Sequence, residues 1–388
     1  MDKRITVGII GIGNQGTSYA QHIIDGKCPD LKLVAVADKN PDRIAWAKEH
    51  FKKDNVTCFE TGDDMLESGL IEACIVAVPH YDHPKYAIMC MEKGIHVMVD
   101  KPAGVYTKQV REMNEVAEKH PEVVFGMMFN QRTNHIYRKM RELVQSGIYG
   151  EIRRTNWLIT SWYRPQAYYD SGDWRATWSG EGGGVLLNQC PHQLDLWQWI
   201  CGMPIAVESH LHYGKWHDIE VEDDVTTYVE YPNGATGVFI TSTGDAHGTN
   251  RFEIQMDKAK IVAENDKLYV LEYEMTEKEF SATNKEPFGL VECHEVEIKT
   301  DGKNEQHVGV LNAWGSAMLR DTPLVANGAE GINGLSLSNA MHLSSFTNSK
   351  VSIPFDEDLY YEELMKRVAT SRRKTNVTAV FADTTDTY

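Results

Sequence analysis

Hydrophobic residues in the first third of the chain form short, continuous runs that alternate with stretches of helical periodicity. The apolar runs cover residues 5–10, 33–37, 73–78, 96–99 and 123–128. The helical stretches between them cover residues 15–25, 41–52, 84–93 and 108–120. Continuous apolar runs of this length suit strands that are buried on both faces of a parallel sheet. The alternation therefore predicts a doubly wound α/β domain.

The pattern changes after about residue 130. A last helical stretch at 138–146 ends at Gly147, and alternating strand-like patterns follow from residue 151. We expect strands in 151–162, 221–231, 236–243, 250–256 and 267–271, and late helices at 308–319 and 331–347. The turn sequence Pro232-Asn233-Gly234 predicts a hairpin between the second and third of these strands. The Thr-rich tail from about Thr370 is expected to be loosely ordered.

These two patterns of hydrophobic and polar residues predict an α/β plus α+β fold with two domains. Residues 1–129 form a doubly wound parallel sheet, and residues 130–388 form a mostly antiparallel sheet with a few helices. The length of 388 residues agrees with two domains. The 39 basic and 56 acidic residues give a net charge of −17, which argues against nucleic acids and anionic membrane surfaces as partners.

The seven cysteines are scattered and form no CxxC pair, so they predict neither a disulfide framework nor a structural zinc site. Reduced thiols suit a cytoplasmic protein. The chain begins directly with a strand pattern, without a signal peptide, and has no apolar run long enough to span a membrane. The histidines at 210, 212 and 217 lack partner ligands at a diagnostic spacing, so no metal is expected.

A glycine-rich turn follows the first strand. The motif G-x-G-x-x-G consists of Gly11, Ile12, Gly13, Asn14, Gln15 and Gly16. Its position between a strand and a helix predicts a Rossmann dinucleotide site, with the pyrophosphate at the helix N-terminus. Asp38 lies 22 residues beyond Gly16, near the offset expected for an acidic residue that binds the adenosine ribose. Asp38 favours NAD, and the neighbouring Lys39 leaves NADP open.

Two later strands end in polar residues. Ligands of an open parallel sheet bind beyond the carboxyl ends of its strands. Pro79, His80 and His83 after the fourth strand are therefore expected to line the dinucleotide site. Asp100 and Lys101 follow the next strand, and Lys101 is expected near the nicotinamide. The alternative interpretation is that Lys101 is a surface charge at a strand end.

In order along the chain, GIGNQG at 11–16, Pro79 with His83, DKPAG at 100–104, GIYG at 147–150 and Gly182-Gly183-Gly184 with His192 form one series of motifs. In this series the chain resembles the glucose-fructose oxidoreductase / inositol dehydrogenase (Gfo/Idh/MocA) family over about residues 4–355. The resemblance implies that Lys101 lies between nicotinamide and substrate, and that the Lys101–Pro102 bond is cis. It further implies that His192 is the active-site histidine and that Asp195 binds substrate.

Two residues depart from the family pattern. Asp100 replaces a glutamate, and Asn188 stands where many members carry aspartate. An asparagine cannot accept a proton at neutral pH. Asn188 is therefore expected to orient a substrate hydroxyl rather than to act as a base.

Oxidation of a secondary alcohol would need a base for the hydroxyl proton. His192 is the best base, because an imidazole near a helix N-terminus tends to stay neutral. Lys101 would stabilise the alkoxide, or would take the proton itself if burial lowered its pKa. The aromatic and cationic segment after residue 161 suits a carbohydrate or cyclitol, with Tyr163, Trp174 and Arg175 as substrate contacts and Arg164 as a weaker choice. An aromatic core between the domains is the alternative.

The sequence leaves three functions open. The first is a dehydrogenase of a sugar, sugar derivative or inositol. The second is a glycosidase that uses NAD in a transient oxidation, and the third is a non-catalytic NAD-sensing regulator. Through the resemblance, a homodimer or homotetramer built on the second sheet is expected. The particular substrate and the direction of the reaction are not predicted.

Overall fold

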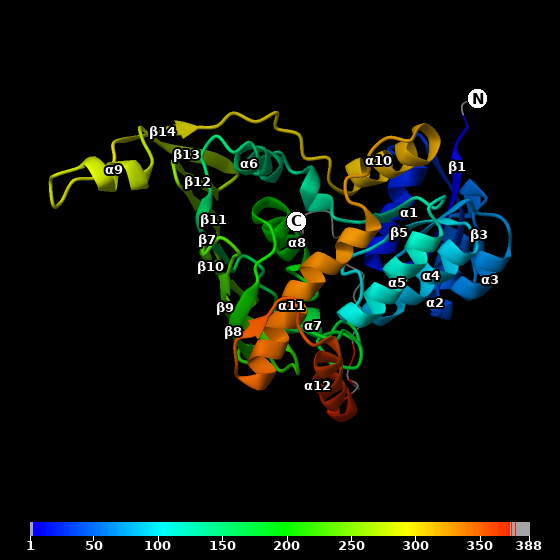
Figure 1. The fold of residues 1–388 in the computed structure, drawn as a ribbon. Coiled ribbons are helices and arrows are strands. Elements are labelled where there is room, and N and C mark those ends of the chain that lie inside the picture. The colour runs from blue at the N-terminus through cyan, green and yellow to red at the C-terminus, as the bar shows by residue number, and fades with distance from the viewer. Residues whose placement is uncertain (1–2, 373, 375–376, 378–388) are drawn as a thin grey trace.

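The computed structural model describes residues 3–372, 374 and 377. Within these residues the chain forms a six-stranded parallel sheet and a nine-stranded, mostly antiparallel sheet, which lie on opposite sides of the molecule (Figure 1). The predicted fold class is therefore confirmed. The tail predicted from Thr370 onward lies largely outside the described residues.

The first sheet has the strand order β3-β2-β1-β4-β5-β6, in which the two strands after β1 lie on one side of it and the later strands on the other. Its strands are β1 (Ile5–Ile10), β2 (Leu31–Ala37), β3 (Thr57–Phe59), β4 (Ala73–Val76), β5 (His96–Val99) and β6 (Phe125–Met127). Its helices are α1 (Asn14–Ile24), α2 (Pro41–His50), α3 (Gly62–Glu67), α4 (His83–Glu92) and α5 (Thr107–Lys119). All neighbouring strands are parallel, as the continuous apolar runs predicted.

Side chains from β1 enter two different cores. Ile9 packs with Tyr19 of α1 on one face of the sheet, whereas Ile10 packs with Tyr86 of α4 on the other. Burial on both faces explains why the sequence of β1 is an unbroken apolar run. β3 was not predicted from the sequence, because its three residues give too short a pattern.

The second sheet has the order β14-β13-β12-β11-β7-β10-β9-β8-β15. Its strands are β7 (Ile152–Ile159), β8 (Ala206–Tyr213), β9 (Glu222–Glu230), β10 (Thr236–Ser242), β11 (Asn250–Met256), β12 (Ala259–Glu264), β13 (Lys267–Tyr273), β14 (Cys293–Glu297) and β15 (Val351–Ser352). Strand β10 pairs with β9 as the predicted hairpin, with Gly234 at a positive φ of 83°. Only the β7–β10 pair among these described strands is parallel.

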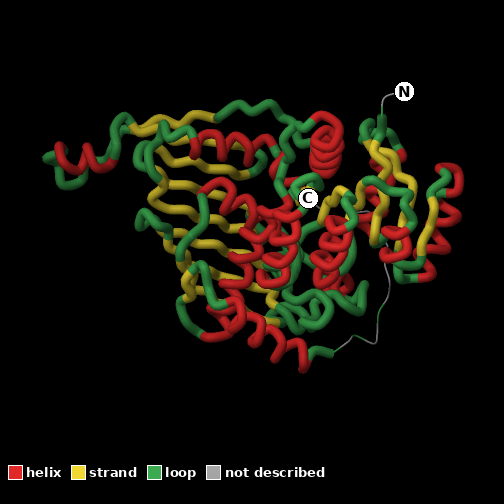
Figure 2. Tube along the Cα trace, turned by 45° about the vertical axis from the view of Figure 1, so that its right-hand side comes forward, coloured by secondary structure: helices red, strands yellow, loops and turns green. Residues whose placement is uncertain are grey.

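Helices lie between the two sheets (Figure 2). They include α6 (His135–Gln145), α8 (Pro191–Cys201) and α11 (Gly331–Thr347), and the short α7 (Gln166–Tyr169) belongs to the same half of the chain. The remaining helices are α9 (Glu277–Thr283), α10 (Gln306–Arg320) and α12 (Glu357–Thr370). Helix α12 and the strands β8, β12 and β14 were not predicted from the sequence.

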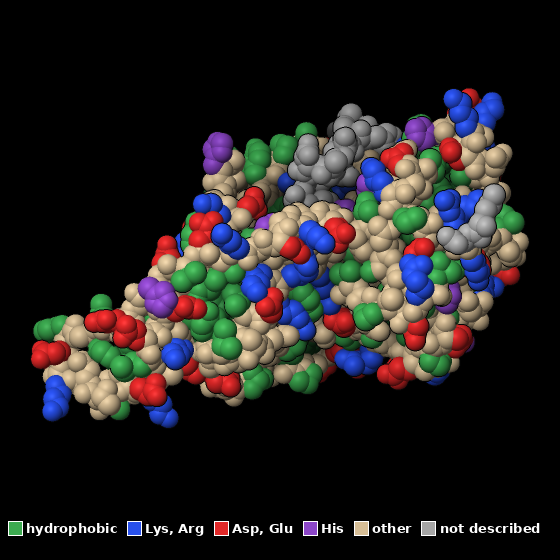
Figure 3. Space-filling view, turned by 90° about the horizontal axis from the view of Figure 1, so that it is seen from above, with side chains coloured by type: hydrophobic (Ala, Val, Ile, Leu, Met, Phe, Trp, Pro, Cys, Tyr) green, Lys and Arg blue, Asp and Glu red, His purple; other side chains and the backbone are tan. Residues whose placement is uncertain are grey.

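Two segments of the second half leave its sheet. Helix α10 returns to the parallel sheet, where Trp314 and Leu311 are fully buried in the same core as Ile9 of β1. Helix α9 and the loop after it form an arm that projects from the body (Figure 3). The arm carries the exposed side chains of Phe288 and Leu290.

Candidate active site

The glycine turn after β1 has the backbone geometry that the motif requires. Gly11 has φ +88°, and a Cβ there would lie 2.4 Å from the carbonyl oxygen of Ala77. A Cβ on Gly16 would lie 1.9 Å from the carbonyl oxygen of Gly11. Both positions therefore demand glycine for close packing of the turn against β4 and α1.

Gly13 differs from these two glycines because it borders open space. No atom lies within 4 Å of the position that its Cβ would occupy. Gly13 is the N-cap of α1, and no side chain caps this helix end. Open space next to uncapped helix N–H groups fits the pyrophosphate of a dinucleotide. Asn14 and Gln15 begin the helix at this point.

Asp38 lies beside the glycine turn, as its spacing predicted. Its Oδ2 accepts a hydrogen bond of 2.9 Å from the N–H of Ile12, and its Oδ1 accepts one of 2.8 Å from the N–H of Asn40. Arg43, which the sequence analysis did not single out, donates from Nε to the carbonyl oxygen of Ile12 at 2.7 Å. Lys39 forms an ion pair of 3.0 Å with Asp82. The charged groups of this region thus fix the conformation of the turn.

The residues after β4 join the two halves of the chain. His80 is buried, and its Nδ1 lies 3.1 Å from the carbonyl oxygen of Glu181. His83 is also buried, with Nδ1 2.6 Å from the carbonyl oxygen of Pro102 and Nε2 2.7 Å from that of Val78. Both ring nitrogens of His83 thus have backbone partners, so the structure gives this residue a loop-joining role that its sequence position did not predict.

Lys101 follows β5 and reaches the second half of the chain. Its Nζ donates a hydrogen bond of 2.7 Å to the backbone carbonyl oxygen of Asn188. Burial lowers the pKa of Lys101, while the carboxylates of Asp100 and Glu181 oppose this effect. Asp100 is buried and accepts from the N–H of Lys101 at 2.8 Å. The Lys101–Pro102 bond is cis, as the family resemblance implies.

His192 is the second residue of α8 and is 1% exposed. Burial holds its pKa well below the usual value of 6.5, and the positive charge of Lys101 lowers it further. Its ring meets that of Phe129 edge-on at 6.3 Å between centroids. His192 lies four residues after Asn188, whose carbonyl oxygen binds Lys101, so the fold brings residues from the two halves of the chain to one region.

Asn188 lies at the centre of a hydrogen-bond cluster. Its Nδ2 donates to Glu181 Oε1 and, at 3.1 Å, to the hydroxyl oxygen of Tyr168. The same hydroxyl oxygen accepts from Arg175 at 2.9 Å and from Gln189 at 3.3 Å. Tyr168 of α7 is therefore the residue that connects the aromatic segment to the segment before α8.

The three predicted substrate contacts occupy different environments. Tyr163 is 43% exposed. The Trp174 ring lies against that of His80 at 5.8 Å between centroids, and the Arg175 guanidinium lies over the rings of Tyr168 and Trp174. Trp174 and Arg175 thus lie beside the Asn188 cluster, whereas Tyr163 is linked to it through Arg164, which donates to the Tyr163 carbonyl oxygen and lies over the Tyr168 ring.

Asp195 forms a buried ion pair inside the protein. Its two oxygens accept hydrogen bonds of 2.6 and 2.7 Å from the guanidinium of Arg132, and both side chains are 1% exposed. Arg132 also pairs with Glu330 at 2.7 Å. Both carboxylate oxygens of Asp195 are engaged, so this residue ties α8 to Arg132, and its contact with a substrate stays a prediction.

A buried glutamate holds the glycine-rich segment before α8. Glu222, at the start of β9, accepts hydrogen bonds of 2.9 Å from the N–H of Gly184 and 3.0 Å from that of Leu186. Nε2 of His342 in α11 lies 2.9 Å from the same carboxylate. These contacts fix the segment that carries Glu181 and Asn188.

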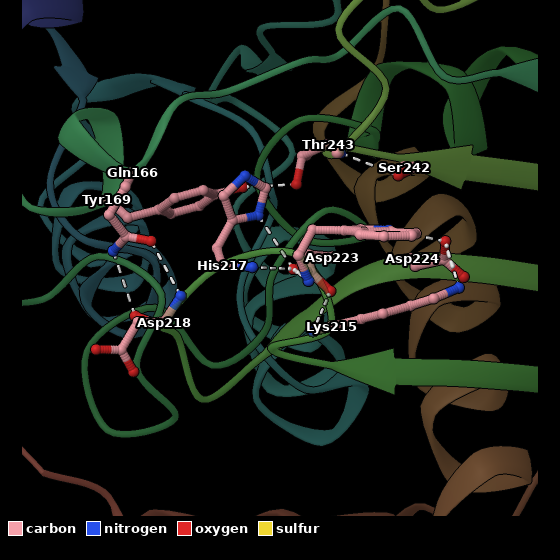
Figure 4. A network of polar contacts seen from close by, with 11 residues as sticks. Gln166, Tyr169, Lys215, His217, Asp218, Asp223, Asp224, Ser242 and Thr243 are labelled. Carbon is pink, nitrogen blue, oxygen red and sulfur yellow. Dashed lines mark hydrogen bonds and ion pairs between the residues drawn. The ribbon is translucent and has the colours of Figure 1, made fainter.

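A second network of polar contacts holds α7 (Figure 4). Tyr169 donates to Thr243 at 2.7 Å, and its ring lies 4.9 Å from that of His217. Asp223 accepts from Nδ1 of His217 at 3.0 Å and from the N–H groups of residues 215–217. Gln166 is bound by the N–H of Asp218 at 3.0 Å. The network anchors α7, and therefore Tyr168, to β9 and β10.

His307 of α10 is a further polar residue that the sequence did not indicate. Its Nε2 lies 3.3 Å from Nε2 of Gln15, and its ring meets that of Tyr19 at 5.5 Å. Burial lowers the pKa of His307 to about 3, with contributions from His22 and Lys101. No local motif marks His307, since it reaches the glycine turn only because α10 folds back.

No group of three His, Cys, Asp or Glu residues is placed to hold a metal ion within residues 3–372. No helix in the described part of the chain is long and apolar enough to cross a membrane.

An open glycine turn at the end of a parallel sheet, with a half-buried lysine at the same edge, defines the class as a dinucleotide-dependent oxidoreductase. The first half matches the model "Oxidoreductase family, NAD-binding Rossmann fold" over residues 5–127. The second half matches "GFO/IDH/MocA C-terminal domain" over residues 137–262. The chain belongs to the Gfo/Idh/MocA family of oxidoreductases, and its cofactor is NAD.

Named relatives agree with this class. The chain is 25% identical over 269 residues to myo-inositol 2-dehydrogenase of Thermotoga maritima, which covers 67% of this chain and 75% of that protein. It is 28% identical over 222 residues to D-glucoside 3-dehydrogenase of Escherichia coli, covering 53% of this chain and 61% of that protein. The WlbA dehydrogenase of Chromobacterium violaceum, solved with NADH and UDP-GlcNAcA, shares the fold with a TM-score of 0.78 and 24% identity over 92% of this chain and 98% of that one.

Proposed function

We propose that the protein transfers a hydride between nicotinamide and a secondary alcohol or ketone of a sugar, a sugar derivative or an inositol. The observation that carries this proposal is the contact of Lys101 Nζ with the carbonyl oxygen of Asn188, which brings a basic group from the parallel sheet to the segment before His192. The relatives named as inositol and glucoside dehydrogenases support the substrate class. The two alternatives, a glycosidase and a non-catalytic regulator, have no comparable support.

Bound NAD would accept or supply the hydride, so the protein must handle the proton and the charge on the substrate oxygen. Gly11, Ile12, Gly13, Asn14, Gln15 and Gly16 would bind the pyrophosphate, and Asp38 the adenosine ribose. Pro79, His80, Asp100 and Lys101 would complete the cofactor side, and His83 would hold the adjoining loops through its backbone contacts. The carboxylate of Asp38 would repel a 2′-phosphate, which favours NAD over NADP.

His192 is the proposed proton acceptor. Its lowered pKa keeps the imidazole neutral across the physiological range, as a base requires. The hydroxyl proton of the substrate would pass to a ring nitrogen of His192 as the carbonyl forms. Lys101, as an ammonium ion, would stabilise the negative charge that develops on the substrate oxygen.

Asn188, Trp174 and Arg175 are the proposed substrate contacts next to these two groups. Asn188 is half-buried and can offer Oδ1 to a hydroxyl, because its Nδ2 is already engaged. An aromatic face beside a cation suits the apolar C–H face and hydroxyl rim of a sugar. Tyr163 is proposed as an outer contact on the basis of its exposure.

We also propose the division into domains 1–129 and 130–388, with α10 packed back on the first domain. A cytoplasmic location is proposed because all seven cysteines are free thiols. A homodimer or homotetramer through the second sheet is proposed from the family resemblance.

The test is a panel of sugars and cyclitols with NAD and with NADP, in which the absorbance of the reduced cofactor is measured. We expect turnover with NAD on at least one secondary alcohol, and a loss of about 10²–10⁴-fold in His192→Ala. Release of reducing sugar from a glycoside without net cofactor reduction would contradict the dehydrogenase and identify the glycosidase. Normal turnover of His192→Ala would contradict its assignment as the base.

A further inference from the structure

The loop before α8 contains a carboxylate that the reaction proposed above does not use. Glu181 is 1% exposed, and its Oε2 accepts a hydrogen bond of 2.6 Å from the N–H of Ala176. Its Oε1 accepts from Nδ2 of Asn188. Glu181 therefore lies directly behind the residue that replaces the aspartate found in many family members.

Charged and titratable groups from several elements face Glu181. Arg175 and Lys101 attract its negative charge, and the buried Glu222 repels it. Tyr169 of α7 also faces it, and Nδ1 of His80 lies 3.1 Å from its carbonyl oxygen. Burial raises the pKa of Glu181 to about 7, although Arg175 and the two hydrogen bonds oppose the shift. Such a group changes its charge within the physiological range.

The charge of Glu181 affects Lys101 in return. Burial lowers the pKa of Lys101, with further lowering by Arg164 and Arg175, whereas Asp100 and Glu181 raise it. Loss of the Glu181 charge would leave Lys101 facing two arginines with only Asp100 as a counter-charge. The ammonium form of Lys101 is therefore stabilised by ionised Glu181.

We propose that Glu181 is a positioning residue that supplies, from behind Asn188, the negative charge that an aspartate would carry at position 188. In its ionised form it fixes the Asn188 amide, so that Oδ1 is the atom left for a substrate hydroxyl. It also holds Lys101 as the ammonium ion that stabilises the substrate oxygen. This role rests on the proposed dehydrogenase function, and the substrate proton still passes to His192.

Turnover should depend on pH, because the ionised form of Glu181 is the active form. Turnover is present above pH 7 and falls as the pH falls through about 7, the pKa of Glu181. Folding has the opposite dependence. Because the pKa is raised from 4.5 in the folded protein, the native state binds the proton more tightly than the unfolded chain. Stability is therefore lost as the pH rises from about 4.5 to 7.

The test compares the wild type with Glu181→Gln, the double variant Glu181→Gln/Asn188→Asp and the control Glu220→Gln. Glu220 is a suitable control because it anchors the same segment, with Oε2 accepting from the N–H of Trp178 at 3.3 Å and from Ser371 at 2.6 Å. Profiles of kcat/KM against pH are measured with NAD and a substrate from the panel. The midpoint of thermal unfolding is measured against pH for the proteins without cofactor.

We expect Glu181→Gln to lower kcat/KM at pH 8 by about 10-fold to 100-fold, the range for residues that orient a contact group. Its profile should lack the limb near pH 7 that the wild type and Glu220→Gln retain. The double variant, which moves the carboxylate to position 188, should regain turnover with a displaced limb. The Tm of the wild type should fall relative to that of Glu181→Gln as the pH rises from 5 to 8.

The role of Glu181 is overturned if the kcat/KM profile of Glu181→Gln keeps the limb near pH 7 of the wild type. It is also overturned if the difference in Tm between the wild type and Glu181→Gln does not change with pH. If Glu181→Gln does not fold, the double variant is used instead. A pH profile of the double variant with the same limb near pH 7 as the wild type would also overturn the role of Glu181. A wild type without turnover on any substrate overturns the proposed function itself. Turnover in the wild type with an unchanged limb in the variant overturns the role of Glu181 alone.

Discussion

The nucleotide side and the substrate side of the proposed active site are assembled in different ways. On the nucleotide side, the turn at 11–16 and the nearby Asp38 are held by contacts with main-chain groups, such as Asp38 with the N–H of Ile12. On the substrate side, segments far apart in the chain meet, as the side chain of Lys101 does with the backbone carbonyl oxygen of Asn188, 87 positions later. The first arrangement can be recognised from local spacing, whereas the second depends on how the two sheets are packed together.

The first prediction tests the substrate side at Lys101. Lys101→Ala should lower kcat/KM by about 10²–10³-fold, the range for removing one preorganised group that stabilises a developing negative charge. Dinucleotide affinity, measured by quenching of protein fluorescence, should stay close to that of the wild type. Equal losses of turnover and dinucleotide affinity would contradict the separation of the two sides.

Lys101→Arg is the matched control. Arginine keeps the positive charge but does not release its proton in proteins. If Lys101 acts as a stabilising cation, the arginine variant should retain more turnover than the alanine variant at every pH. Equal inactivity of both variants, with normal NAD binding and folding, would assign the proton transfer to Lys101 instead of His192.

The second prediction concerns the buried pair of Arg132 and Asp195. Arg132→Met would leave the Asp195 carboxylate buried without its main partner, which typically costs about 3–5 kcal/mol of the free energy of unfolding. Urea unfolding measures this loss. The milder Asp195→Asn should keep the KM of the folded enzyme, since both oxygens of Asp195 bind Arg132. A raised KM in that variant would restore the substrate contact expected from the sequence.

The sequence predicted most strands of the first sheet and the mostly antiparallel arrangement of the second sheet. β1 and β5 begin and end close to their apolar runs, because strands buried on both faces leave an unbroken pattern. The short β3 and the edge strand β14, whose side chains are mostly exposed, leave no such pattern. Helix α12 was missed, although it begins with an Asp356 cap and buries Tyr360 and Leu364.

The residues of the proposed site also fall into those that a local pattern marks and those that only the fold brings together. Gly11, Gly13 and Asp38 have a fixed spacing that marks their roles, and Lys101 follows a strand. Tyr168 and Glu181 gain their importance only through contacts with Asn188. The substitution at position 188 was visible in the sequence, and a search for a nearby acidic residue would have identified Glu181. His307 gave no signal, because only the return of α10 brings it to Gln15.

The third prediction separates two glycines of the same turn. Gly16→Ala places a Cβ 1.9 Å from the carbonyl oxygen of Gly11, so the turn or α1 must shift. We expect it to lose about 1–3 kcal/mol of stability, as overpacked substitutions do, together with NAD affinity. Gly13→Ala meets no protein atom within 4 Å, so it should keep its Tm and lose only NAD affinity. Unchanged NAD affinity in Gly13→Ala would show that the phosphates do not approach this residue.

The smallest expected effect concerns Asp38. Asp38→Asn removes the charge and keeps one oxygen for the N–H of Ile12 or Asn40, so folding should change little. Arg43 would then lose the nearby carboxylate that now raises its pKa against burial, and its positive charge would favour a 2′-phosphate.

We therefore expect the ratio of kcat/KM with NADP to that with NAD to rise about tenfold, equivalent to roughly 1.4 kcal/mol. The control is Asp42→Asn, an exposed carboxylate in the first turn of α2, which should leave the ratio unchanged. An equal rise in both variants would indicate a general charge effect. An unchanged ratio in Asp38→Asn would mean that even the nucleotide side depends on contacts that local spacing does not reveal.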